Sequence, residues 1–204
     1  IENGNLQQNV TVDKNILTAV GSSIYLEIGE KISLKDLLYG MMLRSGNDAS
    51  VVIASYVGGN IENFVKLMNK KAKELGLTNT TFSNCHGLDD DTKNFSTARD
   101  MAILSSYAYK LDIYKEITKT TKYETKSNLK SYVWYNRNKL LTLYDYATGG
   151  KNGYTPDAGR TLVTTASKNN LNLTVVTLAD SNEYDTHISL YTYGYDNYKK
   201  YKIL

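Results

Sequence analysis

Hydrophobic residues recur at helical spacing through much of the first half of the chain, which predicts a group of packed helices. Ser33 and Thr97 each stand three residues before an aspartate, the pattern of a helix-capping box. Asn60 can cap a further helix, which Gly76 would end. The predicted helices cover residues 33–43, the stretch after a polar corner at 45–47 up to 58–59, residues 61–75 and residues 97–110.

Other segments alternate between apolar and polar residues, as strands do. We expect short strands over 10–12 and 23–28 that form a small ribbon, and a short helix followed by a twisted hairpin within 112–135. The runs 160–167 and 172–179 predict a second hairpin. Tyrosines at helical spacing then predict a terminal helix over 184–201.

The composition is that of a single globular domain. The chain has 204 residues, of which 41% are hydrophobic and 22% are charged. It contains no run of eighteen apolar residues and no apolar leader near Ile1, and because it starts without Met we expect an excised piece of a longer protein. The net charge of +3 comes from scattered lysines, which argues against nucleic-acid binding and suits an anionic cell wall.

The residues that commonly bind metals are not grouped. Cys85 is the single cysteine, so no internal disulfide can form, and His86 and His187 are far apart in the sequence. The aspartate run 89–91 lacks the alternation of a calcium-binding loop, so we interpret it as a solvated loop. The sequence therefore predicts neither a metal nor a cofactor.

Two polar stretches interrupt this pattern and carry the candidate chemistry. Ser45-Gly46-Asn47 forms a corner between two apolar helices, where a hydroxyl and a carboxamide could make directed hydrogen bonds. Alone, this corner is more typical of an ordinary turn, because Ser, Gly and Asn are common turn residues. About a hundred residues later, Lys151-Asn152-Gly153 precedes the run 160–167.

The order and spacing of these stretches resemble the penicillin-recognising serine acyl-transferases, and within them the D-alanyl-D-alanine carboxypeptidases of the low-molecular-mass penicillin-binding proteins. Four flanking sequences match the same family: Ser33-Leu34-Lys35-Asp36-Leu37-Leu38-Tyr39-Gly40, His86-Gly87-Leu88-Asp89-Asp90, Ser96-Thr97-Ala98-Arg99-Asp100-Met101-Ala102 and Asn138-Lys139-Leu140-Leu141.

The resemblance implies an α/β fold of the α+β type, like that of β-lactamases and transpeptidases. Residues 1–204 would form one domain that lacks the N-terminal part of the fold. A helical lobe would be built on 33–110, and the antiparallel sheet would include the hairpin and terminal helix within 160–204. The substrate cleft would lie between lobe and sheet.

The resemblance also implies a role for each motif residue. Ser45 would relay a proton between the catalytic lysine and the leaving D-alanine, and Asn47 would bind the substrate amide. Lys151 would place positive charge beside the anionic end of the substrate.

The rest of the second motif would hold the substrate against the sheet. Gly153 would let the substrate backbone lie against the strand, and the N–H of Tyr154 would help to bind the oxyanion. Asn152 replaces the usual Thr of the family, so we expect an altered substrate preference.

The nucleophile's Ser-x-x-Lys motif is the missing part. The one such pair in the chain, Ser127 to Lys130, lies in a polar stretch between the other motifs, and we reject it as the active serine. The family's motif would fall just before Ile1. We therefore expect these 204 residues to be inactive alone, and the missing strands and helix to favour dimerisation or strand exchange.

The expected parent protein is a serine-type D-Ala-D-Ala carboxypeptidase that trims peptidoglycan stem peptides and is acylated by β-lactams. By resemblance it would be extracytoplasmic, secreted or anchored through segments outside this chain. A β-lactamase is one alternative, but Glu62 and Glu74 match no deacylating carboxylate. A non-catalytic cell-wall binding module that keeps the cleft is the other alternative.

Overall fold

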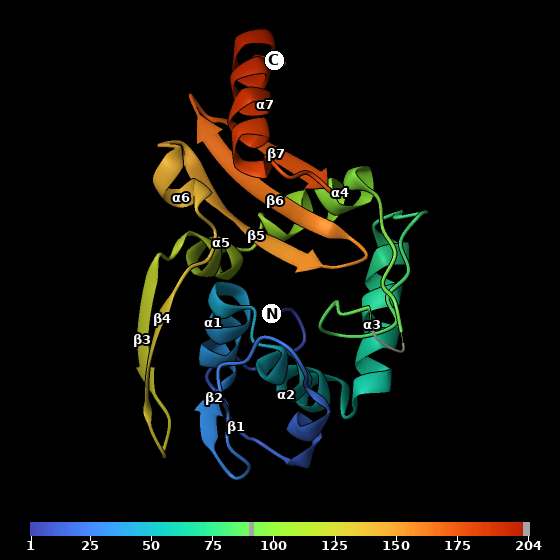
Figure 1. Ribbon diagram of the computed structural model, residues 1–204, viewed down its shortest axis with the longest axis vertical. Helices are drawn as coiled ribbons and strands as arrows, with labels where there is room; N and C mark the ends of the chain where they lie inside the picture. The colour runs from blue at the N-terminus through green and yellow to red at the C-terminus, as the bar shows by residue number, and fades with distance from the viewer. Residues whose placement is uncertain (90–91, 202–204) are drawn as a thin grey trace. The chain divides into compact units, whose positions relative to one another are not determined.

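The computed structural model describes residues 1–89 and 92–201, and it combines α-helices with antiparallel sheets (Figure 1). The chain divides into two compact units. The first unit comprises residues 1–96 and 120–137, and the second comprises 97–119 and the chain from Asn138 onward. The aspartates at 90 and 91 lie outside the described residues, so the solvated-loop interpretation stays a prediction.

The first unit contains the three predicted helices α1 (Leu34–Arg44), α2 (Asn47–Gly58) and α3 (Ile61–Glu74). Ser33 caps α1 by accepting a hydrogen bond from the Asp36 N–H, and Asn60 caps α3 by accepting one from the Asn63 N–H. Leu34, Leu37 and Leu43 are fully buried on α1. The helix predictions are therefore confirmed, because caps and apolar periodicity are both local signals.

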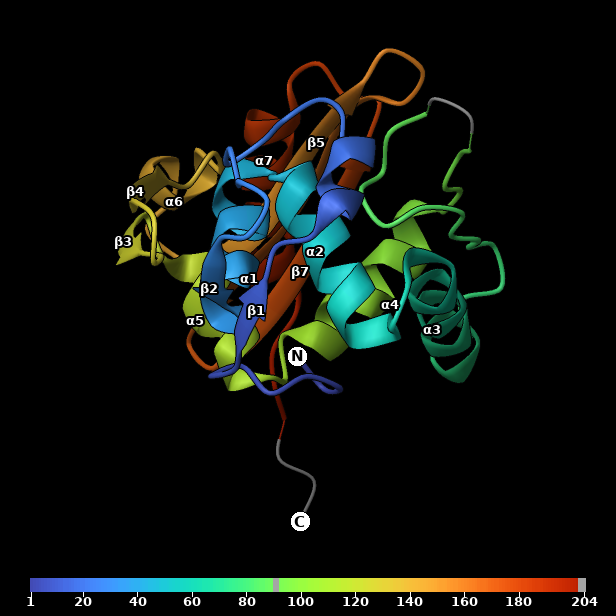
Figure 2. The same cartoon turned by 90° about the horizontal axis from the view of Figure 1, so that it is seen from below.

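The ribbon prediction was partly wrong. Strand β1 (Asn9–Thr11) pairs with β2 (Lys31–Ser33), with the short 3-10 helix η1 (Lys14–Thr18) between them, and Figure 2 shows β1 and β2 together beside α1. Residues 23–28 form no strand. Ile24 and Leu26 are buried, which produces the alternation, but their N–H groups bind a side chain instead of a strand.

The predicted aromatic hairpin consists of β3 (Lys122–Lys126) and β4 (Ser131–Tyr135). The Tyr123 ring stacks on Tyr39 of α1 with centroids 3.6 Å apart, and it also stacks on Trp134 of the neighbouring strand. These rings pack the hairpin onto α1, which explains the aromatic cluster without a bound ligand.

The second unit contains a three-stranded antiparallel sheet in the order β5-β6-β7. The predicted hairpin is confirmed as β6 and β7, joined through Asn169 and Asn170, both with positive φ. The elements of this unit are α4 (Ala98–Ala108), α5 (Asp112–Lys119), α6 (Leu140–Leu143), β5 (Ala147–Thr155), β6 (Gly159–Lys168), β7 (Leu171–Leu178) and α7 (Glu183–Asn197).

Helices α4 and α7 cover opposite faces of this sheet (Figure 1). Thr174 of β7 hydrogen-bonds Ser106 of α4, whereas Thr177, an odd number of residues away, hydrogen-bonds His187 of α7. The α7 face is centred on the fully buried Tyr191. The terminal helix is thus confirmed, although it ends at Asn197, four residues earlier than the periodicity indicated.

Candidate functional site

The Ser45-Gly46-Asn47 corner is formed where α1 ends and α2 begins. Ser45 has φ 59° and ψ 39°, the left-handed conformation that closes a helix, and its N–H donates to the Gly40 carbonyl. A Cβ at Gly46 would lie 3.0 Å from the Asp48 carboxylate and 3.1 Å from the Ile24 side chain. The corner therefore needs its middle glycine for space.

Asn47 is buried and fastened to the segment that crosses the corner. Its backbone N–H donates to the Ser22 carbonyl at 2.7 Å, and its side-chain amide donates to the Val20 carbonyl at 2.6 Å. Between these two acceptors, Gly21 has φ 81° and lies against the Asn47 amide. The hydrogen bond to Val20 thus sets the direction of the carboxamide, and the backbone bond to Ser22 holds the same segment at the corner.

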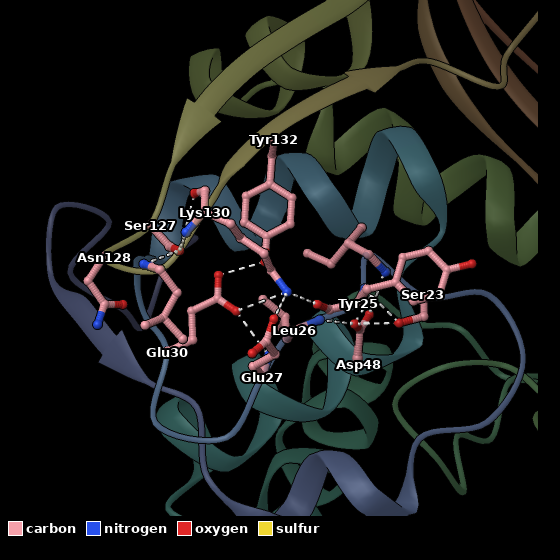
Figure 3. A network of polar contacts seen from close by, with 12 residues as sticks. Ser23, Tyr25, Leu26, Glu27, Glu30, Asp48, Ser127, Asn128, Lys130 and Tyr132 are labelled. Atoms are coloured by element: carbon pink, nitrogen blue, oxygen red, sulfur yellow. Dashed lines mark hydrogen bonds and ion pairs between the residues drawn. The ribbon is translucent and has the colours of Figure 1, made fainter.

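Asp48 is the residue that holds this segment, and our reading of the sequence missed it. Its carboxylate accepts hydrogen bonds from the Ser23 hydroxyl at 2.6 Å and from the Ile24 and Leu26 N–H groups at 3.1 and 3.0 Å (Figure 3). Asp48 is 5% exposed. The sequence does show an acidic residue in the first turn of α2. Such a residue usually indicates a favourable interaction with the helix dipole, not hydrogen bonds to a distant loop.

A second cluster continues this network toward the β3–β4 turn (Figure 3). The Lys130 ammonium lies 2.6 Å from a Glu27 oxygen and also donates to the Tyr25 carbonyl. Glu30 is fully buried and accepts from the Tyr132 hydroxyl at 2.6 Å. Burial raises the pKa of Tyr132, and the hydrogen bond to Glu30 raises it further.

This cluster also bears on the rejected Ser127 to Lys130 pair. The Ser127 hydroxyl accepts the N–H groups of Leu129 and Lys130 within the hairpin turn. The Lys130 ammonium instead contacts Glu27 and the Tyr25 carbonyl. A serine used as a turn acceptor, with its lysine engaged elsewhere, supports rejecting this pair as the nucleophile and base.

Positive charge lies next to the corner. The Arg137 N–H donates to the Leu43 carbonyl at 3.2 Å, and its guanidinium donates to the Ser22 hydroxyl at 3.2 Å. Burial lowers the pKa of Arg137, and the nearby Arg44 lowers it further. Two guanidinium groups close to each other would favour an anionic group at this place.

The second motif lies in the middle of β5. Lys151 pairs with Val163, Asn152 with Leu162, Gly153 with Thr161 and Tyr154 with Arg160, all on β6. Strand β5 is an edge of the three-stranded sheet, and β6 is its one neighbour among the described strands. Tyr154 is 68% exposed. An extended ligand could therefore pair with this edge.

Two further glycines place the motif strand. Gly149 and Gly150 have φ values of 151° and 142°. A Cβ on Gly149 would collide with Thr118 of α5, and one on Gly150 would collide with the Val163 carbonyl of β6. These glycines let β5 approach both neighbours closely, so a residue with a side chain at either position would displace the strand that carries Lys151.

A neutral polar network stabilises the sheet below the motif. Thr164 of β6 hydrogen-bonds His187 at 2.7 Å and the Tyr191 hydroxyl at 2.8 Å, and Thr177 of β7 bonds the other His187 nitrogen at 3.1 Å. Burial lowers the pKa of His187 to about 4. The imidazole is therefore neutral at physiological pH, and because both its nitrogens are hydrogen-bonded to threonines it links β6 and β7 to α7.

The structure thus brings Ser45 and Asn47 together in the first unit and places Lys151, Asn152, Gly153 and Tyr154 in consecutive register in the second. Over residues 1–89 and 92–201, no group of three His, Cys, Asp or Glu side chains could hold a metal ion. No helix in the same ranges is both long enough and apolar enough to cross a membrane.

Comparison with known proteins gives the family. The chain is 38% identical over 177 residues to the D-alanyl-D-alanine carboxypeptidase DacF of Bacillus subtilis, which covers 86% of this chain and 45% of the relative. DacC of Escherichia coli, also a D-alanyl-D-alanine carboxypeptidase, is 40% identical over 180 residues, or 86% of this chain and 44% of DacC. The chain therefore spans a little under half the length of these relatives.

A solved structure agrees with this likeness. A variant of a Streptomyces DD-transpeptidase superimposes with a TM-score of 0.89 at 31% identity, covering 96% of this chain and 82% of that one. This confirms the predicted transpeptidase-like fold. The D-alanyl-D-alanine carboxypeptidase profile, Peptidase_S11, matches residues 3–182. The chain therefore belongs to the D-alanyl-D-alanine carboxypeptidase family.

Proposed function

We propose that this chain carries the substrate-handling part of a serine-type D-Ala-D-Ala carboxypeptidase that acts on peptidoglycan stem peptides. The observation that carries the proposal is the edge strand β5, which contains Lys151, Asn152 and Gly153. The chain belongs to this family and also has the hydrogen-bonded Ser45–Asn47 corner. An acyl-transfer enzyme needs both a way to bind an extended peptide and directed polar groups at its amide.

Within this function, the two motifs would do different work. Ser45 would pass the proton from the catalytic lysine to the departing D-alanine. Asn47 would bind the substrate amide, and its buried side chain, held by a hydrogen bond to the Val20 carbonyl, suits a fixed hydrogen-bonding role. Lys151 would stabilise the anionic end of the substrate.

The remaining motif residues would hold the peptide along β5. Gly153 would let the substrate backbone approach as an added strand, and the N–H of Tyr154 would serve as one oxyanion donor. Asn152 can donate a hydrogen bond to a carboxylate, but it is larger than threonine and has no hydroxyl. We therefore propose a substrate preference that differs from members with threonine.

The nucleophile would come from a Ser-x-x-Lys motif other than Ser127 to Lys130, which is the one such pair in these 204 residues. The complete gene product would then form an acyl-enzyme with peptide or β-lactam, while the 204-residue chain alone would not. The proposed enzyme works outside the cytoplasm, where peptidoglycan lies. Its secretion or anchoring, the dimerisation or strand exchange of the chain, and the limits of the helical lobe remain predictions.

Two other functions have less support. A β-lactamase needs a carboxylate that activates the deacylating water, but Glu62 pairs with Lys66, and Glu74 pairs with Lys70 and Lys71, on the surface of α3. A non-catalytic wall-binding module would keep the β5 edge and lack the nucleophile in the complete gene product as well.

The deciding experiment measures the release of D-alanine from diacetyl-L-Lys-D-Ala-D-Ala by the complete gene product, its Lys151→Ala variant and the 204-residue chain. We expect hydrolysis by the complete product, a loss of about a hundredfold or more in Lys151→Ala, and none by the chain. Binding of the peptide without hydrolysis by the complete product would support the wall-binding module instead.

A further inference from the structure

Tyr25 has an unusual backbone conformation for an aromatic residue. Its φ is 65°, in the left-handed region that glycine and asparagine adopt easily and that a bulky side chain disfavours. Its neighbours Ile24 and Leu26 both donate their N–H groups to Asp48. Strain of this kind persists when surrounding contacts impose it, and it is concentrated at functional sites.

Several contacts impose the conformation. The Tyr25 N–H donates to the Ser23 hydroxyl at 2.8 Å, and that hydroxyl in turn donates to Asp48. The Tyr25 carbonyl accepts from the Lys130 ammonium, which also pairs with Glu27. Both peptide groups that flank the Tyr25 side chain are therefore fixed by other residues (Figure 3).

The ring gains little from this arrangement in the fold itself. It is 78% exposed, while Ile24 and Leu26 on either side are 4% and 8% exposed. Figure 3 shows the ring directed away from the Lys130 side of the network. Glycine or asparagine at this position would keep the same backbone contacts with less strain. A rigidly displayed aromatic ring is instead what a binding surface requires.

Tyr25 belongs to the segment that is hydrogen-bonded to the Asn47 corner. Ser22, whose carbonyl accepts the Asn47 N–H, precedes Tyr25 by three residues, a reach of at most ~10 Å along the chain. Arg137, which binds the Ser22 hydroxyl, is close enough to Tyr25 that the phenol partly offsets the lowering of the Arg137 pKa. A substrate residue next to an amide bound at Asn47 would therefore start within about 10 Å of Tyr25.

We propose that Tyr25 determines specificity by packing its ring on the side chain of the substrate residue that precedes the terminal D-Ala-D-Ala. The inference rests on the proposed function, because it assumes that the peptide amide binds at Asn47. The contact requires an aliphatic side chain at that substrate position, such as the methylene chain of a diamino acid. The Tyr25 hydroxyl is not required.

The experiment compares two peptides in the complete gene product, diacetyl-L-Lys-D-Ala-D-Ala and acetyl-Gly-D-Ala-D-Ala. Tyr25→Asn keeps the left-handed backbone and removes the ring, whereas Tyr25→Phe keeps the ring. Tyr198→Asn, which removes a similarly exposed ring in the second unit, is the matched control. KM, kcat and the thermal midpoint are measured for each variant.

We expect Tyr25→Asn to raise KM for the lysyl peptide about tenfold, with kcat within about twofold and no loss of thermal midpoint. With the glycyl peptide its KM should equal that of the unsubstituted protein. Tyr25→Phe and Tyr198→Asn should change neither peptide's KM by more than about twofold.

Three results would overturn the inference. The first is an unchanged KM for the lysyl peptide in Tyr25→Asn, and the second is an equal rise for both peptides with a lowered midpoint, which would show a purely structural role. In both cases the unsubstituted protein still hydrolyses peptide, so the proposed function stands. The third is a protein that hydrolyses neither peptide, which overturns the proposed function as well.

Discussion

The two units stabilise their motifs with different kinds of polar network. In the first unit a buried carboxylate, Asp48, collects hydrogen bonds from Ser23, Ile24 and Leu26, and the ion pair of Lys130 with Glu27 continues the network outward. In the second unit the neutral His187 is linked to Thr164 and Thr177 inside the core.

The difference follows from what each network has to hold. Residues 20–26 form no sheet or helix, so their N–H groups need acceptors from a side chain, and one carboxylate can accept several. The backbone of strand β5 is already hydrogen-bonded to β6. The second unit therefore needs side-chain hydrogen bonds only between the strands and α7. Loss of the Asp48 network should therefore destabilise the first unit strongly, because residues 20–26 have no backbone pairing to replace it. The neutral network of the second unit should weaken when His187 is protonated.

The largest effect is expected for Asp48→Ala. This change leaves the buried N–H groups of Ile24 and Leu26 without their acceptor, and it should lower the free energy of unfolding by about 3–4 kcal/mol. Urea unfolding followed by the fluorescence of Trp134, which is buried in the same unit, measures it.

The matched control for this change is Asp48→Asn. Its carboxamide oxygen can still accept hydrogen bonds, so a loss of about 1–2 kcal/mol is expected. If alanine and asparagine destabilise the protein equally, the hydrogen bonds to Asp48 are not what holds residues 20–26.

A smaller effect is expected from pH through His187. Its pKa is about 4 in the folded protein, lowered by burial from the ordinary 6.5, so the unfolded chain binds a proton first as the pH falls. The stability contribution is complete above the unfolded pKa and decreases between about pH 6.5 and 4. We expect a loss of about 2 kcal/mol from His187 between about pH 7 and 5.

The check is amide hydrogen exchange in β6 and β7 across this pH range, corrected for the intrinsic rate. His187→Gln cannot titrate, so it should show a flatter pH dependence, although it is less stable at about pH 7 because one ring contact is lost. An equally steep pH dependence in His187→Gln would assign the effect to other groups.

The smallest effect is expected for Lys130→Met. Lys130 and Glu27 are partly exposed, with 30% and 62% of their side chains accessible. The buried Glu30 lies farther from Lys130, at 3.8 Å, and keeps its hydrogen bond from Tyr132, so removing Lys130 should cost about 1 kcal/mol. The deficit should shrink in about 1 M salt, because screening already weakens the pair in the unsubstituted protein. A deficit independent of salt would mean that the contact with the Tyr25 carbonyl matters more than the charge.

The sequence predicted the elements whose signals are local. The caps at Ser33, Asn60 and Thr97 and the hairpin turn at Asn169 are decided by neighbouring residues, and the structure confirms the elements they begin or join. The strand predicted over 23–28 failed because the alternation of Ile24 and Leu26 reports burial only. The partner of their N–H groups is Asp48, more than twenty residues away.

The candidate site follows the same division. The positions of Ser45, Asn47 and Lys151 could be selected from motif spacing, because a family resemblance preserves spacing. The hydrogen bonds of Asp48 and His187 join residues that are far apart in the sequence. No local sequence pattern predicts such pairs. The strain at Tyr25 is likewise imposed by Ser23 and Lys130 from different parts of the chain.

Under the proposed function, these residues serve an acyl-transfer reaction whose nucleophile none of the 204 residues provides. The most direct test is the intact mass of labelled penicillin adducts on the complete gene product and on the 204-residue chain. With the proposed function, we expect one covalent adduct on the complete gene product and none on the 204-residue chain. An adduct on the 204-residue chain, or the absence of adducts on both proteins, would contradict it.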